Sequence, residues 1–435
     1  MSFVVNDTGH TTEHNRLLGL GDFCTPEQFG AVGDGVTDDT VALQAAIDYI
    51  IANESVLYIS NPHLISAQLD ITPSDKWKII GSNFKAKIIQ SADNTRIFSF
   101  NGSFSRAFRI SGLDLTWSNL QTGNTNAIAF AFTEGGEFSA AWGFYDFIIS
   151  DIRLTKGYLA FGQTDITVTN PIWGCVLENW IIGSDWCGPV VINRNTAGGS
   201  PNFVIRYFYL RCDSMNGIVP FHFENIRGLT ISDVEINDSA ILRAFTIETC
   251  FAVSLRNVRS ERVEVALADG SSPCGILFSN AEGSVDGFEI QTITCDRPDT
   301  PTIIFFGVRA SNNSTVSVDN LKLVSATYVG GSTSNGLSVD TSHITMVTSP
   351  KGFSIAYNYS ARTVISGVGT TNGSLYAGAH IEVGEFARRI LSGNGSPEGA
   401  ITASVGSIYM RADGGAGTTM YVKETGSGNT GWAAK

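Results

Sequence analysis

The sequence has few positive charges and no long apolar run. Its 435 residues contain 28 lysines and arginines against 41 aspartates and glutamates, which gives a net charge of −13 at pH 7. Because no basic stripe is available to neutralise phosphates, we expect no nucleic-acid partner. No apolar run reaches the ~20 residues that a membrane-spanning helix needs, so we expect no membrane insertion.

The N-terminal residues 1–20 also lack a basic leader, an apolar core and a small-residue cleavage site. We therefore expect the chain to be made and assembled in the cytoplasm of the cell that produces it. The seven cysteines are odd in number and form no C-x-x-C pair, which argues against a disulfide framework or a zinc site. We predict reduced, buried thiols, no metal ion and no cofactor.

A short β-type phrase repeats through the middle of the chain. It reads apolar, any, apolar, any, turn residue, apolar, any, apolar, and its clearest copies are 147–154, 229–236 and 316–323. Each copy predicts two short strands that meet at a corner. The corner position is occupied in successive copies by Gly112, Asp151, Asn179, Tyr207, Asp233, Asn257, Gly287 and Asn320.

A second apolar phrase lies between these copies and keeps the same cadence. Aligning Phe161, Ile192, Phe223, Ile247 and Phe278 gives steps of 31, 31, 24 and 31 residues. Three strands in each turn of ~25 to 30 residues, with alternating inward apolar positions, are typical of a parallel β-helix. A β-propeller needs longer and more regular repeats, and a β-sandwich would not keep two phrases in step.

The predicted fold is therefore all-β, a right-handed parallel β-helix with one short helix before it. Thr37 and Asp38 can cap that helix, which we expect to close the N-terminal end of the solenoid. Its predicted apolar stripe comprises Val41, Leu43, Ala46, Ile47 and Ile50. We divide the chain into an attachment peptide at 1–22, the β-helix at 23–345 and a glycine-rich, β-rich C-terminal region at 346–435.

Residues 29–48, followed by 55–60, resemble the opening segment of the pectate-lyase-like β-helix superfamily, which includes polygalacturonases and many phage tail spikes. The matching residues are Phe29, Gly30, Ala31, Gly33, Asp34, Gly35, Asp38, Asp39, Ala42, Leu43, Gln44, Ala46 and Ile47. The central coils lack the paired aspartates and the R-I-K phrase of the polygalacturonases, so activity on pectin is not implied.

The C-terminal run 396–432 resembles the ending of many phage tail fibre and tail spike proteins. Its matching residues include Gly399, Gly406, Ser407, Tyr409, Arg411, Asp413, Gly414, Gly415, Thr418, Tyr421, Lys423, Gly431 and Trp432. Together the two resemblances imply a virion protein of the phage tail, a homotrimer, often with depolymerase activity against capsule or lipopolysaccharide. Residues 1–22 would then dock on another tail or baseplate protein, and 346–435 would serve trimerisation or receptor contact.

Candidate catalytic residues emerge from the alignment, because equivalent positions of stacked coils lie about 4.8 Å apart. One predicted outward column holds Asn193, Glu224 and Glu248, with His222 on the same face two residues before Glu224. When two carboxylates lie so close together, ionising both costs free energy, so we expect the pKa of one of them to rise. A carboxyl group with a raised pKa suits the general acid of glycoside hydrolysis. The alternative is that the glutamates only pair with surface cations.

A second column is predicted at Asp185 and Asp213, with Asp238 one residue out of register, although aspartate after a strand is also common in turns. Aromatic residues crowd positions 140–210, at Trp142, Trp173, Trp180, Trp186, Tyr207 and Tyr209. They fit a glycan groove or a subunit interface equally well. The candidate substrate-binding residues are Trp173, Trp186, Tyr209, Asn193 and Asp238.

The hypothesis from sequence is a phage tail spike that binds a bacterial surface polysaccharide, capsule or O-antigen, and hydrolyses it during host adsorption. Glu224, Glu248, Asp213, Asp185 and His222 are its candidate catalytic residues. A lyase would instead use His222 or a tyrosine as base and would need a uronic-acid substrate. A receptor-binding or structural tail fibre would carry out no catalysis.

Overall fold

The computed structural model describes most of the chain between residue 23 and the C-terminus. The described residues are 23–72, 74–82, 85–101, 105–132, 143–163, 172–194, 200–211, 217–237, 241–264, 274–295, 304–312, 314–319, 322–328, 333–339, 343–346, 355–357, 363–365, 380–383 and 388–435. The chain forms two compact units, a long β-solenoid and a small C-terminal sheet. No helix in the described ranges is long and apolar enough to cross a membrane.

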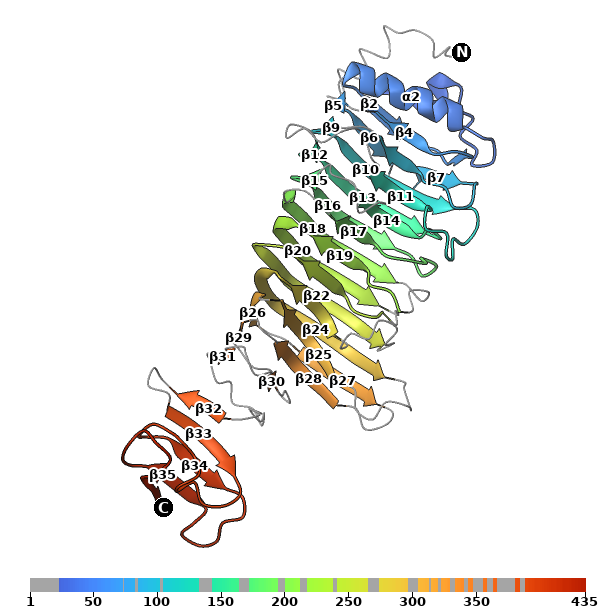
Figure 1. Cartoon of the computed structure of the whole chain (residues 1–435). Coiled ribbons are helices and arrows are strands. Elements are labelled where there is room, and N and C mark those ends of the chain that lie inside the picture. Colours follow the sequence, from blue (N-terminus) through green and yellow to red (C-terminus); the bar gives the residue numbers. More distant parts are fainter. Residues whose placement is uncertain are drawn as a thin grey trace. The chain divides into compact units, whose positions relative to one another are not determined.

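The solenoid is a right-handed parallel β-helix, as predicted. Its strands form three sheets that run along the solenoid (Figure 1), and every strand pair described in them is parallel. We call the largest, of 16 strands, sheet A. It comprises β1 (Phe23–Cys24), β2 (Val56–Ile59), β3 (His63–Ile65), β6 (Lys78–Gly81), β7 (Lys87–Gln90), β10 (Arg109–Trp117), β13 (Ile148–Thr155), β16 (Val176–Ile182), β18 (Ser200–Arg211), β20 (Ile226–Asn237), β22 (Val253–Glu264), β24 (Glu282–Cys295), β26 (Thr315–Asp319), β27 (Lys322–Tyr328), β29 (His343–Met346) and β31 (Thr363–Ile365).

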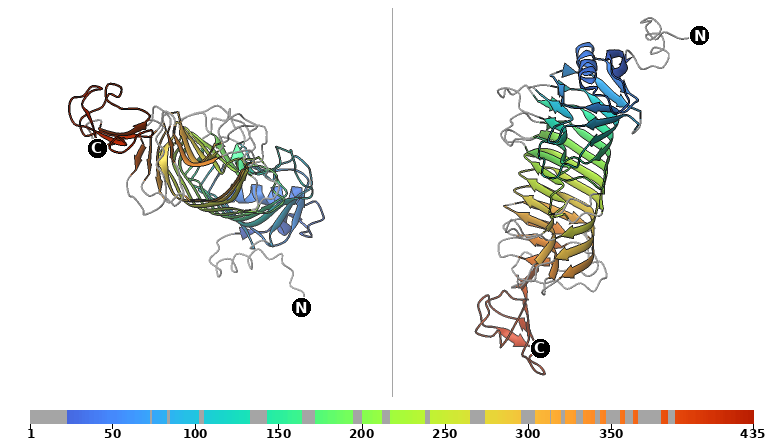
Figure 2. Two further views of the ribbon diagram at one scale, coloured as in Figure 1. Left: turned by 90° about the horizontal axis from the view of Figure 1, so that it is seen from below. Right: turned by 90° about the vertical axis from the view of Figure 1, so that its right-hand side faces the viewer.

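Two further sheets lie beside sheet A, and the smaller of them spans only four coils. Sheet B has 11 strands, β4 (Leu69–Ile71), β8 (Phe98–Phe100), β11 (Ile128–Phe132), β14 (Leu159–Gln163), β17 (Val191–Arg194), β19 (Phe221–Glu224), β21 (Phe245–Glu248), β23 (Cys274–Ser279), β25 (Ile304–Ser311), β28 (Thr333–Val339) and β30 (Ile355–Tyr357). Sheet C has four two-residue strands, β5 (Ser74–Asp75), β9 (Ser105–Arg106), β12 (Phe144–Tyr145) and β15 (Ile172–Trp173). Viewed toward the end of the solenoid, the coils enclose one continuous core (Figure 2).

The corners of sheet A lie where the repeat predicts them. The residues at the predicted turn position adopt the left-handed conformation in each described coil, with φ of 57° at Asp151 and 58° at Asn179. This conformation costs least for Gly, Asn and Asp, which explains the composition of the repeat. Asn179 Nδ2 also donates to Asp151 Oδ1 at 2.7 Å, and Asn257 Nδ2 donates to Asp233 Oδ1 at 2.7 Å. The corners are therefore tied to one another from coil to coil.

Aromatic residues stack in the core at the coil spacing. The rings of Phe100 and Phe132 lie 4.5 Å apart and nearly parallel, and those of Phe108 and Phe147 do the same at 4.5 Å. Each fully buried phenylalanine contributes roughly 1.5 to 3 kcal/mol. Five cysteines are buried free thiols, as predicted, namely Cys24, Cys175, Cys187, Cys250 and Cys274. Burial raises the pKa of Cys24 to about 12, so its thiol is inert at neutral pH.

The N-terminal end of the solenoid is closed by a 3-10 turn, Pro26–Phe29, and the helix α2 (Thr40–Asn53). The buried face of α2 is Ala42, Leu43, Ala46, Ile47 and Ile50. The inclusion of Val41 in the predicted stripe is wrong, because it is 84% exposed. The predicted capping by Thr37 and Asp38 is wrong, because the N-cap position is occupied by Asp39, without a side-chain cap bond. Asp38, one residue earlier, accepts from the N–H of Thr40 at 3.0 Å.

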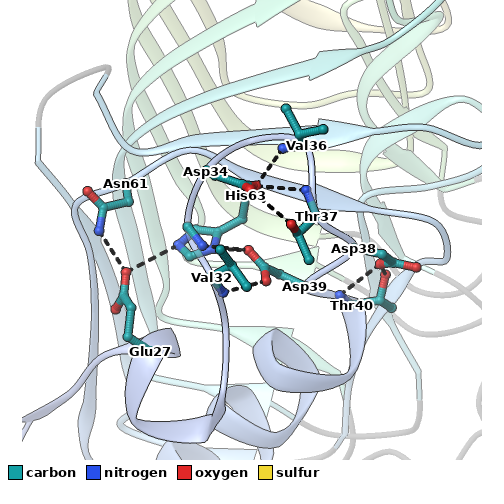
Figure 3. A network of polar contacts seen from close by, with 11 residues as sticks. Glu27, Val32, Asp34, Val36, Thr37, Asp38, Asp39, Thr40, Asn61 and His63 are labelled. Carbon is teal, nitrogen blue, oxygen red and sulfur yellow. Dashed lines mark hydrogen bonds and ion pairs between the residues drawn. The ribbon is translucent and has the colours of Figure 1, made fainter.

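Asp39 stands at the N-cap position, but its carboxylate bonds to the opening segment and not to the helix (Figure 3). Its carboxylate accepts from the N–H groups of Val32 and Gly33 at 2.7 and 3.0 Å. It also lies 2.7 Å from Nδ1 of His63, which is fully buried. Glu27, 3.9 Å from the other ring nitrogen of His63, accepts from Asn61 at 2.8 Å. The matched motif thus builds a polar clamp under the first coil.

The C-terminal unit contains a sheet of five strands, β32 (His380–Val383), β33 (Arg388–Gly393), β34 (Ile408–Arg411), β35 (Met420–Lys423) and β36 (Trp432–Ala434). Its core comprises Ala403, Tyr409, Tyr421 and Trp432. Lys423 is fully buried beside them, and its ammonium donates to the carbonyls of Gly428 and Thr430. Several of the C-terminal motif residues therefore serve this core.

Candidate functional site

A charged cluster lies on the outward face of sheet B, across three successive coils. In β19 and β21 the phenylalanines and Ile247 point into the core, so His222, Glu224 and Glu248 point outward and are half-buried. Backbone hydrogen bonds pair Glu224 with Glu248 and with Arg194 at the end of β17. We call Arg194, His222, Glu224 and Glu248 the sheet B cluster. Its two glutamates are register partners in adjacent coils, and its histidine contacts Glu248.

Each carboxylate of the sheet B cluster has a cationic or hydrogen-bonding partner from the preceding coil. Arg194 Nε donates to Glu224 Oε2 at 2.8 Å. His222 Nε2 donates to Glu248 Oε2 at 2.7 Å. Both pairs are partly exposed, so the cluster is accessible to a ligand of the solenoid surface.

The hydrogen bond from His222 lowers the pKa of Glu248 below its ordinary value. Burial opposes this effect, and the charges of His222, Arg194 and Arg243 add to it. Glu248 is therefore ionised at neutral pH and is not a glutamate whose pKa rises. Such a carboxylate can act as a base, as a nucleophile or as a stabiliser of positive charge, but not as a general acid.

The predicted position of Asn193 in this outward column is wrong. Asn193 is fully buried and pairs with Phe223, so it points into the core, where neither of its side-chain polar atoms has a hydrogen-bond partner among the described atoms. The alignment placed Ile192 beside Phe161, whereas the backbone pairs Val191 with Phe161. A shift of one residue turns a side chain to the opposite face of a strand.

Arg194 takes the outward place that was predicted for Asn193, and sequence reasoning missed it as a site residue. The signal for it is the strict alternation V-V-I-N-R, in which Val191 and Asn193 share one face and Arg194 faces outward. Arg243 is a further basic residue near the sheet B cluster. It is 4% exposed and lies just before β21, where its charge acts on Glu248.

The aromatic candidates fall into two groups. Trp186 is fully buried, with its N–H donating to Pro189 O at 3.2 Å, so it cannot present a ring face to a sugar. Trp173 on β15 is 38% exposed and Tyr209 on β18 is 40% exposed. Trp173 therefore lies on sheet C and Tyr209 on sheet A, and neither belongs to the sheet B cluster.

The aspartate column stays a prediction. Asp185 is half-buried in the link between β16 and β17, at the opposite end of β17 from Arg194. It is therefore not brought to the sheet B cluster, whose acids end their strands. Asp213, Asp238 and Trp142 lie outside the described residues.

Comparison with known proteins gives a short sequence match and several distant structural ones. No protein-family model matches the chain. A stretch of 37 residues is 60% identical to a protein of Klebsiella phage K5-2 named depolymerase 1, capsule K30/K69-specific. This stretch covers 8% of the chain and only 5% of that relative's length.

Solved structures similar to the chain include PfbA, a surface adhesin of Streptococcus pneumoniae, at 12% identity and a TM-score of 0.46 over 82% of this chain and 99% of PfbA. Tailspike protein 3 of bacteriophage CBA120 matches at 11% identity and a TM-score of 0.45 over 97% of this chain and 70% of its own. A protein of Geobacillus virus E2 matches at 12% identity and a TM-score of 0.44 over 78% and 65%. With TM-scores below 0.5, these likenesses do not bear on the chemistry of the chain.

Proposed function

We propose that the chain is the subunit of a bacteriophage tail spike that binds a bacterial surface polysaccharide and depolymerises it by glycoside hydrolysis during host adsorption. The observation that carries this proposal is the sheet B cluster, in which two outward glutamates of adjacent coils lie beside a histidine and an arginine. The short match to a phage protein named as a capsule depolymerase supports the same function. Capsule or O-antigen is the proposed substrate.

In the proposed mechanism Glu248 acts as the nucleophile or base, because the hydrogen bond from His222 keeps it ionised. Once its ion pair with Arg194 opens, Glu224 takes up a proton from solvent water and donates that proton to the leaving oxygen as the glycosidic bond breaks. A polar group of the sugar that binds Arg194 would release Glu224 for this role. The arginine would thus couple substrate binding to the protonation of Glu224.

The spacing of the two glutamates favours retention of configuration. Register partners in adjacent coils have backbones about 4.8 Å apart, close to the ~5 Å carboxyl separation of retaining glycosidases and shorter than that of inverting ones. We therefore propose a covalent glycosyl-enzyme intermediate on Glu248. A water molecule would hydrolyse it with Glu224 as base.

The decisive experiment incubates the full-length protein with surface polysaccharides extracted from candidate hosts and follows reducing ends together with the absorbance of unsaturated uronate. We expect reducing ends without unsaturation, and a loss of roughly 10² or more in rate for Glu224→Gln and Glu248→Gln. Glu235→Gln is the matched control, because Glu235 forms a similar 2.9 Å ion pair with Arg259 on sheet A. Unsaturated products would show that the reaction is that of a lyase and not hydrolysis, with His222 as the proposed base.

A non-catalytic receptor-binding spike is the second candidate, and one observation favours it. Both carboxylates are already paired, Glu224 with Arg194 and Glu248 with His222, as in an ordinary surface ladder. If the protein bound a polysaccharide without cleaving it, the result would support this candidate and reject the enzyme. In either case we propose a homotrimer in the phage tail, attached through residues 1–22 to another tail or baseplate protein.

A further inference from the structure

Sheet C and its continuation carry one outward side chain in each coil. In register order this column reads Asp75, Arg106, Tyr145, Trp173, Pro201, Arg227 and Phe251. Backbone hydrogen bonds place Pro201 in the column after Trp173. The carbonyl of Pro201 accepts from the N–H of Gly174, and the carbonyl of Trp173 accepts in the same way from the N–H of Asp146. The residue before each member is buried wherever its burial is described, at Ser105, Phe144, Ile172, Ile226 and Cys250. The column therefore lies on the surface.

Five consecutive members of this column, from Tyr145 to Phe251, we call the sheet C stripe. Trp173 is 38% exposed and Phe251 is 43% exposed, so each ring is supported by the solenoid and open on one side. The rings of Tyr145 and Trp173 lie 6.4 Å apart at 41°. Arg227 is exposed and has no ion-pair partner in the described part of the chain. Aromatic faces and a guanidinium group are the side chains that sugars stack on and hydrogen-bond to.

We propose that the sheet C stripe is a platform that holds an extended glycan chain along the solenoid axis and leads it to the sheet B cluster. The inference rests on the proposed function, because it takes the same polysaccharide as ligand. Tyr145, Trp173 and Pro201 support successive sugar rings. Arg227 donates hydrogen bonds to sugar oxygens, and Phe251 ends the platform.

The stripe and the sheet B cluster meet at one corner of the solenoid. Arg227 follows Glu224 by three residues, and Phe251 follows Glu248 by three residues. A single left-handed residue makes each corner, with φ of 57° at Asn225 and 51° at Thr249. A chain held on Arg227 and Phe251 is therefore one corner away from the two carboxylates.

The shape of the stripe selects a chain-like ligand rather than a protein. Where both flanking corners are described, one outward residue lies between them, as Arg227 does between Asn225 and Gly228, both with positive φ. A stable protein interface buries ~20 to 30 residues on each side, far more than a ridge one residue wide supplies. Five positions at ~4.8 Å span about 19 Å, which is long enough for several sugars in a row.

The test measures binding of the full-length Glu248→Gln protein, which should not consume its ligand, to an immobilised host polysaccharide that this protein retains. Trp173→Ala and Tyr145→Ala, each in that background, are expected to weaken the affinity for the long polysaccharide about tenfold. They should leave the affinity for short fragments of the same glycan unchanged. Tyr49→Ala is the matched control, because Tyr49 is 44% exposed on α2, away from both surfaces.

Three outcomes would decide against the stripe. Equal binding of the long polysaccharide by the stripe variants and the parent would overturn it while leaving the proposed function intact. A change in the molecular mass of the Trp173→Ala protein, measured by light scattering, would show a subunit contact instead. Failure of the parent to retain any host polysaccharide would reject the proposed function, and the stripe with it.

Discussion

Asp39 and His63 are buried together under the first coil, with relative exposures of 2% and 0%. A buried carboxylate is costly unless donors surround it, and here two backbone N–H groups and an imidazole supply them. The same sequence motif contains Asp38, whose bonds to Thr40 and Ser66 lie at the surface. These two neighbouring aspartates therefore differ in how much the fold depends on them.

We predict that Asp39→Asn lowers the free energy of unfolding by about 3 kcal/mol, because an amide cannot accept all three hydrogen bonds at once. Asp38→Asn, the matched control, should cost under ~1 kcal/mol, since water can replace its exposed bonds. Thermal melting followed by circular dichroism measures both. Equal losses in the two variants would contradict the buried clamp.

The ionisation of Glu248 makes the stability of the protein depend on pH. Its folded pKa lies below its ordinary value because His222 donates to it, so its contribution to stability is present above the pKa of an unfolded glutamate. That contribution is lost as the pH falls through the folded pKa. We predict that the difference in Tm between the wild-type protein and Glu248→Gln shrinks as the pH falls below about pH 4. A difference that grows toward pH 3 would contradict this assignment.

At the scale of elements, the corner that follows the sheet B strands β19, β21, β23 and β25 forms a ladder of residues with positive φ. It comprises Asn225, Thr249, Asn280 and Asn312, with φ between 49° and 57°. Asparagine tolerates this conformation because its short polar side chain can bond locally, whereas a β-branched residue is strained there. Thr249 is therefore the weak member of the ladder.

We predict that Thr249→Asn stabilises the solenoid by up to about 1 kcal/mol, because it removes the β-branched residue from the left-handed region. Thr249→Val should not stabilise, since it keeps the branch and loses the hydroxyl group. The Tm values of the two variants measure the effect. A Tm for Thr249→Asn below that of the wild-type protein would show that the threonine has a role beyond the turn.

At the scale of the whole molecule, exposed apolar residues on sheet A form the face that we propose for contacts between the subunits of a trimer. Ile181 and Tyr209 are register partners, 37% and 40% exposed, and Tyr207 at the neighbouring corner is 55% exposed. Tyrosine is enriched at protein interfaces, and cyclic symmetry buries such a face in every subunit. These residues stand apart from the sheet C stripe and remain available for association.

We predict that the protein in solution has a mass near three times 46.6 kDa, measured by light scattering after gel filtration. Tyr209→Lys should shift that mass toward one subunit, because a lysine cannot be buried in an apolar contact without a partner. Tyr58→Lys is the control, because Tyr58 is 37% exposed near the N-terminal end of sheet A. A monomeric wild-type protein at micromolar concentration would contradict the trimer.

The sequence by itself determined the solenoid, because its signals are local. Asn, Asp and Gly recur where the chain must adopt a positive φ, and apolar residues alternate on either side of those corners. The outward pair Glu224 and Glu248 was predictable for the same reason, since β19 and β21 align without a shift.

Only the tertiary structure decided which neighbours these residues have. The register at β17 turns Asn193 inward and Arg194 outward, and loops of different length between coils hide that register from a sequence alignment. The burial of Trp186 and the bonds that pair Glu224 with Arg194 and Glu248 with His222 likewise depend on contacts between coils. A parallel β-helix makes its side-chain contacts between residues ~24 to 39 positions apart, so the sequence determines the coil and the stacking of coils determines the site.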